Sequence, residues 1–231
     1  MRSAAQFYHQ VAEEYDRRWA YPASVTARQT AWLARKFRPG RILDLGCGTG
    51  RMLGPLAQAG FDPVGLDHCA AMLATARRRH RGPRLVLADA GQGLPFEDHC
   101  FDLIISLHAT LSHLTDADER RRLAGEALRV LRPGGAMVLE LPHPASFPPD
   151  QPAGAWRTFS PGISCRRLGR RTEELRLDHR ADLTTLIHVF DPTDLATWLA
   201  DFDRVLLYPG FRAGRYHPHR GDTMVVCAYK D

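Results

Sequence analysis

Short apolar runs alternate along the chain with longer stretches whose apolar residues recur at helical spacing. The run "FDLIISL" (101–107) is almost continuously apolar, which is typical of a strand buried on both faces of a parallel sheet. The other expected elements are strands at 41–45, 62–66, 84–88 and 136–141 and helices at 51–59, 69–79 and 115–131. Strands that alternate with helices predict a doubly wound, mostly parallel sheet with helices on both faces.

The N-terminal part of the chain lies outside this alternation. Two helices are expected at 4–17 and 24–37. Pro22 separates them, because proline lacks the backbone N–H that a helix interior needs. We interpret residues 1–38 as a helical cap on the sheet.

The C-terminal part adds a helix and two strands to the predicted sheet. A helix is expected at 191–202, followed by strands within 203–211 and 222–230. These strands can pair as an antiparallel hairpin at one edge, which brings the expected sheet to seven strands. The length suits one α/β domain with an insertion, so we interpret residues 1–231 as a single domain.

The segment 143–190 differs in composition from the rest of the chain. Its first part is rich in proline and aromatic residues, among them Phe147 and Trp156, and has no helical period. The stretches "GISCRRLG" (162–169) and "DLTTLIHVF" (182–190) have the character of antiparallel strands. We therefore predict a small antiparallel flap that is inserted over the pocket.

The composition is that of an ordinary globular protein, with 44% hydrophobic and 25% charged residues. No apolar run approaches the roughly 20 residues of a membrane helix, and the N-terminus lacks the apolar core of a signal peptide. The five cysteines are scattered and form no CxxC pair, which favours reduced thiols over disulfides or a zinc site. We therefore expect a cytoplasmic protein with no membrane partner and no metal.

The formal net charge is +5, and almost all of the positive charges are arginines, since Lys36 and Lys230 are the only lysines in the sequence. The stretches 76–84 and 165–171 are basic and could bind RNA or DNA. The alternative is a solvated surface, because acidic residues are interleaved with the arginines and no aromatic-rich basic motif is present. We favour the solvated surface and expect no nucleic-acid partner.

The stretch "ILDLGCGTGRM" (42–52) combines an acid inside a strand with a glycine-rich turn. Glycines at 46, 48 and 50 allow positive φ and let a ligand contact the main chain. Their GxGxG spacing differs from the GxGxxG of dinucleotide-binding turns. Asp44 would repel a pyrophosphate but would attract a cation, and its alternative role is to accept hydrogen bonds from loop amides. S-adenosylmethionine fits the first role, since it carries an ammonium and a sulfonium group and no phosphate.

Two further acids follow the next strands. Asp67 ends the second strand, where a carboxylate can bind the hydroxyls of a ribose. Asp89 ends the third strand, where it can accept a hydrogen bond from the exocyclic amine of adenine. Either acid could instead cap the segment that follows it. In a doubly wound sheet all these positions lie at the carboxyl ends of the strands, where ligands bind.

An ordered set of motifs carries a resemblance to a known family. The segments "ILDLGCGTG", "VGLDHCAAML", "LADAGQGLPFEDHCFDLIIS" and "EALRVLRPGGAMVLEL" together resemble the class I S-adenosylmethionine-dependent methyltransferases, over about residues 7–142. The N-terminal "FYHQVAEEYDRRW" is similar to the leading helix of the small-molecule branch. The resemblance implies a Rossmann-like methyltransferase fold, S-adenosyl-L-methionine as cofactor and S-adenosyl-L-homocysteine as product.

The resemblance also implies which residues approach the cofactor: Tyr15, Asp44, Gly46, Cys47, Gly48, Gly50, Asp67, His68, Asp89, Ala90 and Leu107. Within this set, Gly46 and Gly48 contact the methionine and ribose portion. Asp67 binds the ribose, and Asp89 with the amide of Ala90 reads adenine. His68 departs from the small or apolar residue that relatives often carry there, and it either stacks on adenine or faces solvent.

Methyl transfer rests largely on proximity and alignment, and it requires a base only when the nucleophile is protonated. Three histidines at expected strand ends are candidates for that base: His108, His113 and His143. Each could instead form hydrogen bonds with loop backbone. The resemblance places His108, together with Leu107, near the transferred methyl group.

The acceptor is the least constrained part of the prediction. The stretch after the fourth strand, "SLHATLSHL", lacks the Asp/Asn-Pro-Pro-aromatic run of adenine-N6 methylases, and no Pro-Cys dipeptide of the cytosine-C5 type occurs. We therefore predict transfer to an O, N or C nucleophile of a small molecule. The alternatives are an RNA or protein methyltransferase that uses the arginine-rich surface, and a non-catalytic partner protein that binds S-adenosylmethionine. A nicotinamide oxidoreductase is disfavoured by the GxGxG spacing and by Asp44.

Overall fold

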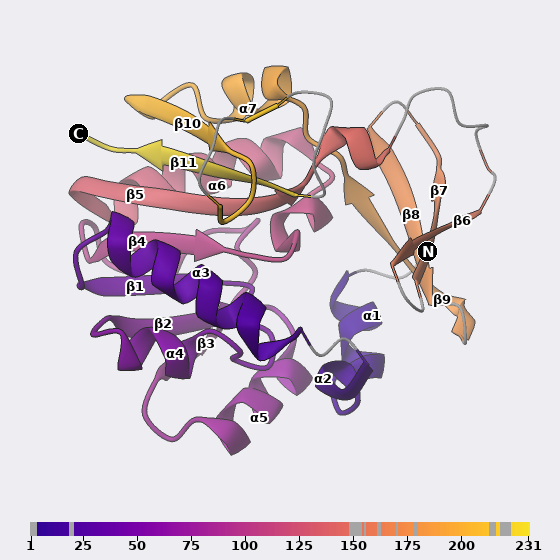
Figure 1. Ribbon diagram of the computed structural model, residues 1–231, viewed down its shortest axis with the longest axis horizontal. Helices are drawn as coiled ribbons and strands as arrows, with labels where there is room; N and C mark the ends of the chain where they lie inside the picture. The colour runs from indigo at the N-terminus through magenta and orange to yellow at the C-terminus, as the bar shows by residue number, and fades with distance from the viewer. Residues whose placement is uncertain are drawn as a thin grey trace.

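A seven-stranded sheet runs through the centre of the computed structural model (Figure 1). The structure describes residues 4–18, 21–147, 154, 156–160, 163–169, 171–177, 180–212, 216–217 and 223–231. The strands are β1 (Arg41–Leu45), β2 (Asp62–Asp67), β3 (Arg84–Leu87), β4 (Phe101–Ser106), β5 (Leu131–Pro142), β10 (Arg204–Tyr208) and β11 (Thr223–Tyr229). Their order is β10-β11-β5-β4-β1-β2-β3.

The sheet is parallel except at one edge. The strand β1 lies between β2 and β4, with Asp44 opposite Gly65 on one side and Ile105 on the other. The strand β11 runs antiparallel to both β5 and β10, so the expected C-terminal hairpin is present, with β11 on its inner side. The prediction of a doubly wound, mostly parallel sheet of seven strands is confirmed.

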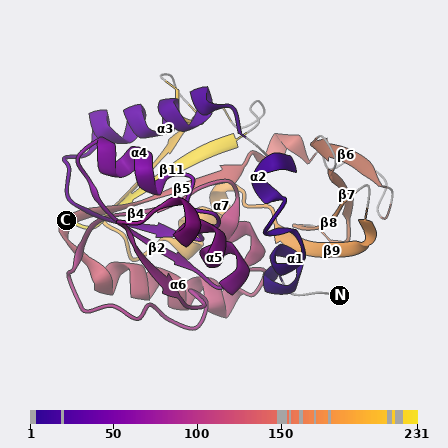
Figure 2. The ribbon, with the colours of Figure 1, turned by 90° about the horizontal axis from the view of Figure 1, so that it is seen from below.

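Helices cover both faces of this sheet (Figure 2). The helices of the sheet are α3 (Ala23–Lys36), α4 (Leu53–Gln58), α5 (Ala70–Arg79), α6 (Ala117–Val130) and α7 (Pro192–Trp198). Because side chains alternate along a strand, Ile42 packs with the apolar residues of α3 and α4, whereas Leu43 packs with those of α6 and α7. None of the described helices is long and apolar enough to cross a membrane.

Two boundaries near α6 differ from the sequence prediction. The helix begins at Ala117 rather than at residue 115, and it is capped by Asp116, whose side chain accepts from the amides of Asp118 and Glu119. It ends at Val130, and β5 begins at the next residue rather than at residue 136. The "RPGG" segment is therefore part of the strand. The start of β5 pairs with the start of β4 and with the C-terminal end of the chain.

A second, four-stranded antiparallel sheet lies beyond the carboxyl ends of the parallel strands (Figure 1). Its strands are β6 (Arg157–Ser160), β7 (Ile163–Arg167), β8 (Thr172–Leu177) and β9 (Arg180–His188). Cys165 and Ile187 pack here against Phe147. The small antiparallel sheet that the sequence predicts is therefore present. Whether 143–190 acts as a flap over the active site stays a prediction, as does the cap function of residues 1–38.

The N-terminal segment forms two short helices, α1 (Ala4–Val11) and α2 (Tyr15–Arg18), where one helix was expected at 4–17. Phe7 and Val11 of α1 pack against Met72 of α5, and α1 also contacts β9. On α2, Asp16 accepts from the Thr49 hydroxyl at 2.8 Å and forms an ion pair with Arg79 at 2.5 Å. These contacts hold the N-terminal helices over the carboxyl ends of β1 and β2.

Candidate active site

A cavity of about 120 Å³ lies at the carboxyl ends of β1, β2 and β4; we call it the first cavity. The structure brings most of the predicted site residues to its wall: Tyr15, Asp44, Gly46, Cys47, Gly48, Asp67, His68, Asp89, Ala90, Leu107, His108 and His113. Two predicted residues, Gly50 and His143, are absent from this wall. The site prediction therefore selected one place in the fold, although the role of each residue stays a prediction.

The glycine loop shows two different reasons for glycine. Gly48 has a φ of 56°, and a side chain there would meet no atom within 4 Å, so its backbone is open to a ligand. Gly50 has a φ of 81°, and a Cβ there would come within 2.9 Å of the His80 side chain. Gly50 therefore serves the turn and its packing rather than the cavity.

Asp67 holds this loop in place. Its Oδ2 accepts from the Gly48 amide at 2.9 Å, and its Oδ1 accepts from the Cys69 amide at 2.8 Å. Burial raises the pKa of Asp67, while these backbone bonds act in the opposite direction. The carboxylate joins the glycine loop to the start of α5, and it lines the first cavity with lone pairs left to accept further hydrogen bonds.

Asp44 does not take the structural role that the sequence left open. The loop amides of Gly46 and Cys47 donate to the Leu66 carbonyl, and that of Gly48 donates to Asp67. No hydrogen bond reaches the Asp44 carboxylate from the described residues, and its exposed fraction is 4%. Burial raises its pKa to about 7, although the charge of Arg51 lowers it. A buried carboxylate without a partner, facing a cavity, is suited to a cationic ligand.

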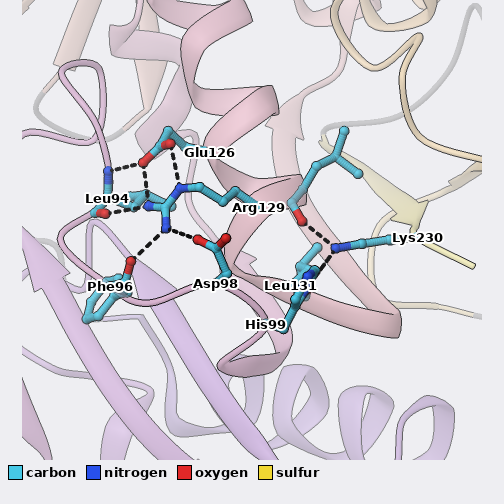
Figure 3. A network of polar contacts seen from close by, with 9 residues as sticks. Leu94, Phe96, Asp98, His99, Glu126, Arg129, Leu131 and Lys230 are labelled. Atoms are coloured by element: carbon cyan, nitrogen blue, oxygen red, sulfur yellow. Dashed lines mark hydrogen bonds and ion pairs between the residues drawn. The ribbon is translucent and has the colours of Figure 1, made fainter.

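The loop that carries Asp89 is fixed from outside the cavity. Asp89 is exposed, and its Oδ1 accepts from the Gly91 amide at 2.9 Å, so the cap role considered for it is present. Farther along the loop, Arg129 of α6 donates to the carbonyls of Leu94 and Phe96 (Figure 3). Glu126 accepts from the Leu94 amide and pairs with Arg129 at 2.8 Å, which holds the pKa of Glu126 at about 2 (Figure 3). This network fastens the loop to α6.

Arg51 is a site residue that the sequence analysis missed. It directly follows the glycine loop, where it was interpreted as the first residue of a helix. Its Nη1 donates to Thr26 Oγ1 at 2.6 Å and to Gln29 Oε1 at 2.8 Å, and its Nη2 contacts Nε2 of His108. Burial lowers its pKa, against the raising effect of Asp44 and Glu140. An arginine beside a glycine loop is a sequence signal for a site residue. The direction in which the Arg51 side chain points, however, depends on its contacts with α3.

Glu140 was missed as well. It lies in β5 with an exposed fraction of 7%, and its Oε2 accepts from Gln29 Nε2 at 3.0 Å and from the His108 amide at 3.1 Å. Burial raises its pKa. The signal was available, because "AMVLEL" places an acid inside an apolar strand just as "ILDL" does for Asp44.

His108 lies between these groups, at a φ of 55° followed by Ala109 at 59°. Left-handed backbone at consecutive non-glycine residues is costly and is typical of sites where a loop is held for function. Since Arg51 is always a donor, the contact occupies the lone pair of His108 Nε2. Burial and the Arg51 charge lower the pKa of His108 to about 3, so the ring is neutral.

His113 is also held neutral, with both ring nitrogens engaged. Its Nδ1 lies 3.0 Å from the carbonyl oxygen of Leu186 in β9, so this nitrogen carries the proton. Its Nε2 then accepts from the Tyr8 hydroxyl at 2.9 Å. Burial lowers the pKa of His113 to about 4. The ring therefore connects α1 to the small sheet.

His143 lies outside both cavities, and its ring contacts backbone groups of the protein. It is buried, with an exposed fraction of 1%, and it lines neither this cavity nor the one described next. Its Nδ1 accepts from the Ala145 amide at 3.1 Å, and its Nε2 lies 2.9 Å from the His217 carbonyl. The geometry does not favour His143 as a base, because the ring caps a short helix (Pro144–Ser146) instead of facing a ligand.

A second cavity, of about 390 Å³, adjoins the first. Five residues line both cavities: Tyr8, Tyr15, Tyr21, His108 and His113. The second cavity is otherwise formed by α1, α3, β5 and the small sheet, which contributes Leu175, Thr185 and Ile187. The shared residues form the boundary at which two ligands would meet.

His68 and Cys47 are two further predicted residues in the wall of the first cavity. His68 lines the first cavity, and its Nε2 is buried without a hydrogen-bond partner in the described part of the chain. Burial raises the pKa of the Cys47 thiol, which makes it unreactive. Stacking of His68 on adenine therefore stays a prediction.

Comparisons with known proteins agree with this geometry. Residues 42–135 match the family model described as a methyltransferase domain. A demethylmenaquinone methyltransferase of Renibacterium salmoninarum is 39% identical over 110 residues, which are 47% of this chain and 44% of that protein. An 18S rRNA (guanine-N(7))-methyltransferase of Bos taurus is 36% identical over 112 residues, which are 45% of this chain and 40% of that protein. The solved CcbJ methyltransferase of Streptomyces caelestis has a TM-score of 0.78 at 20% identity, over 97% of both chains.

The matched segments span less than half of those two curated relatives, whereas the fold is shared over nearly the whole chain. Residues 42–135 are therefore similar to a methyltransferase domain, and nearly the whole chain has the fold of a solved methyltransferase. The family resemblance carried by the four motifs is therefore confirmed.

Proposed function

We propose that the chain is an enzyme that moves a methyl group from S-adenosylmethionine to a nucleophile of a small molecule. The observation that carries this proposal is the pair of adjoining cavities, with Tyr8, His108 and His113 at their boundary. A group-transfer enzyme must hold two ligands with their reacting atoms in contact, since alignment supplies most of the rate.

The residues of the first cavity fit S-adenosylmethionine. Its amino-acid end is a zwitterion, and the cavity offers Asp44 for the ammonium and Arg51 for the carboxylate. Asp67 can accept from the ribose hydroxyls while it keeps its two backbone bonds. When bound, this cofactor supplies a methyl group on a positively charged sulfur. The chain's part is to orient it and to exclude water.

The second cavity supports a small acceptor. Its volume of about 390 Å³ is within the usual range for small-molecule pockets, which is roughly 300–1,000 Å³. Apolar and aromatic side chains from α1 and the small sheet, such as Phe7, Leu175 and Ile187, form part of its wall. A wall of this kind excludes water around the reacting atoms, which favours transfer to the acceptor over loss to solvent.

The first test is ligand binding and labelling. Calorimetry should show S-adenosylhomocysteine binding and no heat from NAD. Incubation with methyl-labelled cofactor and a fractionated metabolite extract should yield a labelled small product. Tight binding of NAD alone, or intact cofactor binding with no labelled product from any extract, would reject the enzyme proposal. The second result would favour a binding protein.

An RNA acceptor is the second candidate, since one of the relatives is named as an rRNA methyltransferase and the chain is rich in arginine. Binding to a generic RNA duplex separates the two candidates. A nucleic-acid acceptor predicts affinity that falls steeply with salt, because counterions are released on binding. Labelled RNA in place of a labelled metabolite would favour this candidate.

A further inference from the structure

The second cavity contains one carboxylate oxygen that the protein leaves without a partner. Both hydrogen bonds to the Glu140 side chain, from Gln29 and from the His108 amide, reach Oε2. Oε1 has no hydrogen-bond partner in the described residues, and Glu140 lines the second cavity. A carboxylate that is 7% exposed and half-satisfied is directed at whatever fills that cavity.

The protein also supplies no direct positive charge to this carboxylate. The nearest ionisable nitrogen paired with it is His108 Nδ1, at 3.8 Å from Oε2, and that histidine is neutral. Arg51 and Arg28 act on Glu140 only through space, and no ion pair within 4.0 Å joins either of them to it among the described residues. A desolvated acid without a cation is costly, and this cost is removed when a ligand brings the cation.

We infer that the acceptor is an amine, and that it donates an N–H to Oε1 of Glu140 while its lone pair faces the first cavity. This inference rests on the proposed function and names its substrate class. The arginines that line the same cavity, Arg28 and Arg212, are both exposed, and neither forms an ion pair with Glu140 within 4.0 Å in the described part of the chain.

The chemistry of an amine acceptor balances without a base in the transfer step. The free amine forms a C–N bond as the C–S bond breaks, and the positive charge moves from sulfur to nitrogen. The product is an N-methylammonium and a neutral thioether. A carboxylate beside the nitrogen is stabilising where this charge appears, which is the usual form of transition-state stabilisation. The proton that an ammonium form must lose leaves for solvent before the transfer.

The histidines agree with this mechanism. An alcohol acceptor would have to transfer a proton during the reaction, and neither histidine at the boundary of the cavities has a free lone pair to take it. The lone pair of His108 is occupied by Arg51, and that of His113 is occupied by the Tyr8 hydroxyl. Both rings therefore act as neutral walls in this structure, and Glu140 offers the unsatisfied oxygen.

The binding test uses benzylamine and its neutral counterpart benzyl alcohol as probes. Each is titrated into the protein saturated with S-adenosylhomocysteine, and chemical-shift changes report affinity. We expect benzylamine to bind roughly ten- to a hundredfold more tightly than benzyl alcohol, and Glu140→Gln to remove the difference. Glu140→Asp should retain part of it. Equal binding of the two probes to the wild type would overturn the inference.

Glu174→Gln is the matched control. Glu174 is another buried glutamate, but it pairs with Arg166 at 2.6 Å, and it lies on the face of the small sheet opposite to Leu175. This variant should keep the preference for benzylamine. Loss of the preference in both variants would show a general effect of removing a buried charge and would overturn the role of Glu140.

The labelled products from the metabolite extract give the second readout, because mass spectrometry locates the methyl group. Methyl on nitrogen, with a rate that falls in Glu140→Gln, is the expected result. Methyl on oxygen, carbon or sulfur would overturn the inference and leave the proposed function intact. The absence of any labelled product would overturn the proposed function, while the probe titration would still decide the cation preference of Glu140.

Discussion

The two cavities adjoin, but the chain builds them in different ways. Apart from the N-terminal residues that it shares with the second cavity and Asp16, the first cavity is lined mainly by the ends of β1, β2 and β4 and the loops that follow β1, β2, β3 and β4, so its residues come in short runs along the sequence. The second is formed by α1, α3, β5, the small sheet and the two ends of the β10–β11 connection. A sequence motif therefore marks the residues of the first cavity, whereas no motif marks those of the second.

Their buried acids show the same difference. Asp44 and Glu140 each lie inside an apolar strand of the parallel sheet, and each faces its own cavity. A glycine-rich turn follows Asp44, whereas "LPHP" follows Glu140. An acid inside a buried strand thus indicates a candidate site residue by itself. A neighbouring motif only makes that residue easier to recognise in the sequence.

The largest expected effect comes from the anchor of the first cavity. Asp67→Ala removes two hydrogen bonds to the backbone and the group proposed to bind the ribose, so affinity for S-adenosylhomocysteine should fall by roughly a hundredfold or more. Calorimetry measures this directly. Asp62→Ala, at the exposed start of the same strand, is the control and should leave affinity unchanged. Unchanged affinity in Asp67→Ala would remove Asp67 from the site.

A smaller effect, and one that depends on pH, is expected for Asp44→Asn. The folded-state pKa of about 7 exceeds the ordinary 3.8, so the folded protein holds more protons than the unfolded chain between these values. Stability from this group is therefore lost as pH rises from about 4 to 7. The Tm of Asp44→Asn relative to wild type should increase over that range. A constant difference would contradict the raised pKa.

The variant Asp44→Asn also tests whether the ammonium group of the cofactor binds at Asp44. A bound ammonium would lower the pKa of Asp44, so cofactor binding should release a proton near pH 6 and tighten as pH rises to about 7. Calorimetry in buffers of different ionisation enthalpy counts the protons. In Asp44→Asn the release should disappear, and affinity at pH 8 should fall by roughly tenfold. Proton release that persists in the variant would assign it to another group.

The smallest effect is expected where the small sheet joins the main sheet. Arg171 pairs with Asp191 at 2.5 Å and contacts Asp194, and both acids belong to the capping box of α7. Arg171→Ala should increase amide exchange in β9 and weaken benzylamine binding by roughly fivefold, with cofactor affinity unchanged. Arg121→Ala, which removes an exposed ion pair on α6, is the control. Equal losses at both cavities would show that they are not independent.

Sequence reasoning reached the first cavity because its signals are local. Apolar alternation fixes which segments are strands, and the rule that ligands bind at their carboxyl ends brings Asp44, Asp67 and Asp89 together. It also put Gly50 and His143 in the site, but neither lines the first cavity: Gly50 packs closely against His80, and the ring of His143 caps a short helix. A spacing pattern shows that a turn needs glycine, but not whether a ligand or a neighbouring side chain is the reason.

The sequence by itself determined the parallel sheet, the edge hairpin, the glycine loop and the family, because each depends on residues that are near one another in the chain. Only the tertiary structure decided the contacts of the histidines and of Glu140. His113 meets Tyr8 across 105 positions, and Gln29 meets Glu140 across 111. Such contacts depend on how α1 and α3 pack over the sheet. That packing places a half-satisfied carboxylate in the wall of the second cavity, and it leaves no free histidine lone pair among the described residues at the boundary of the two cavities.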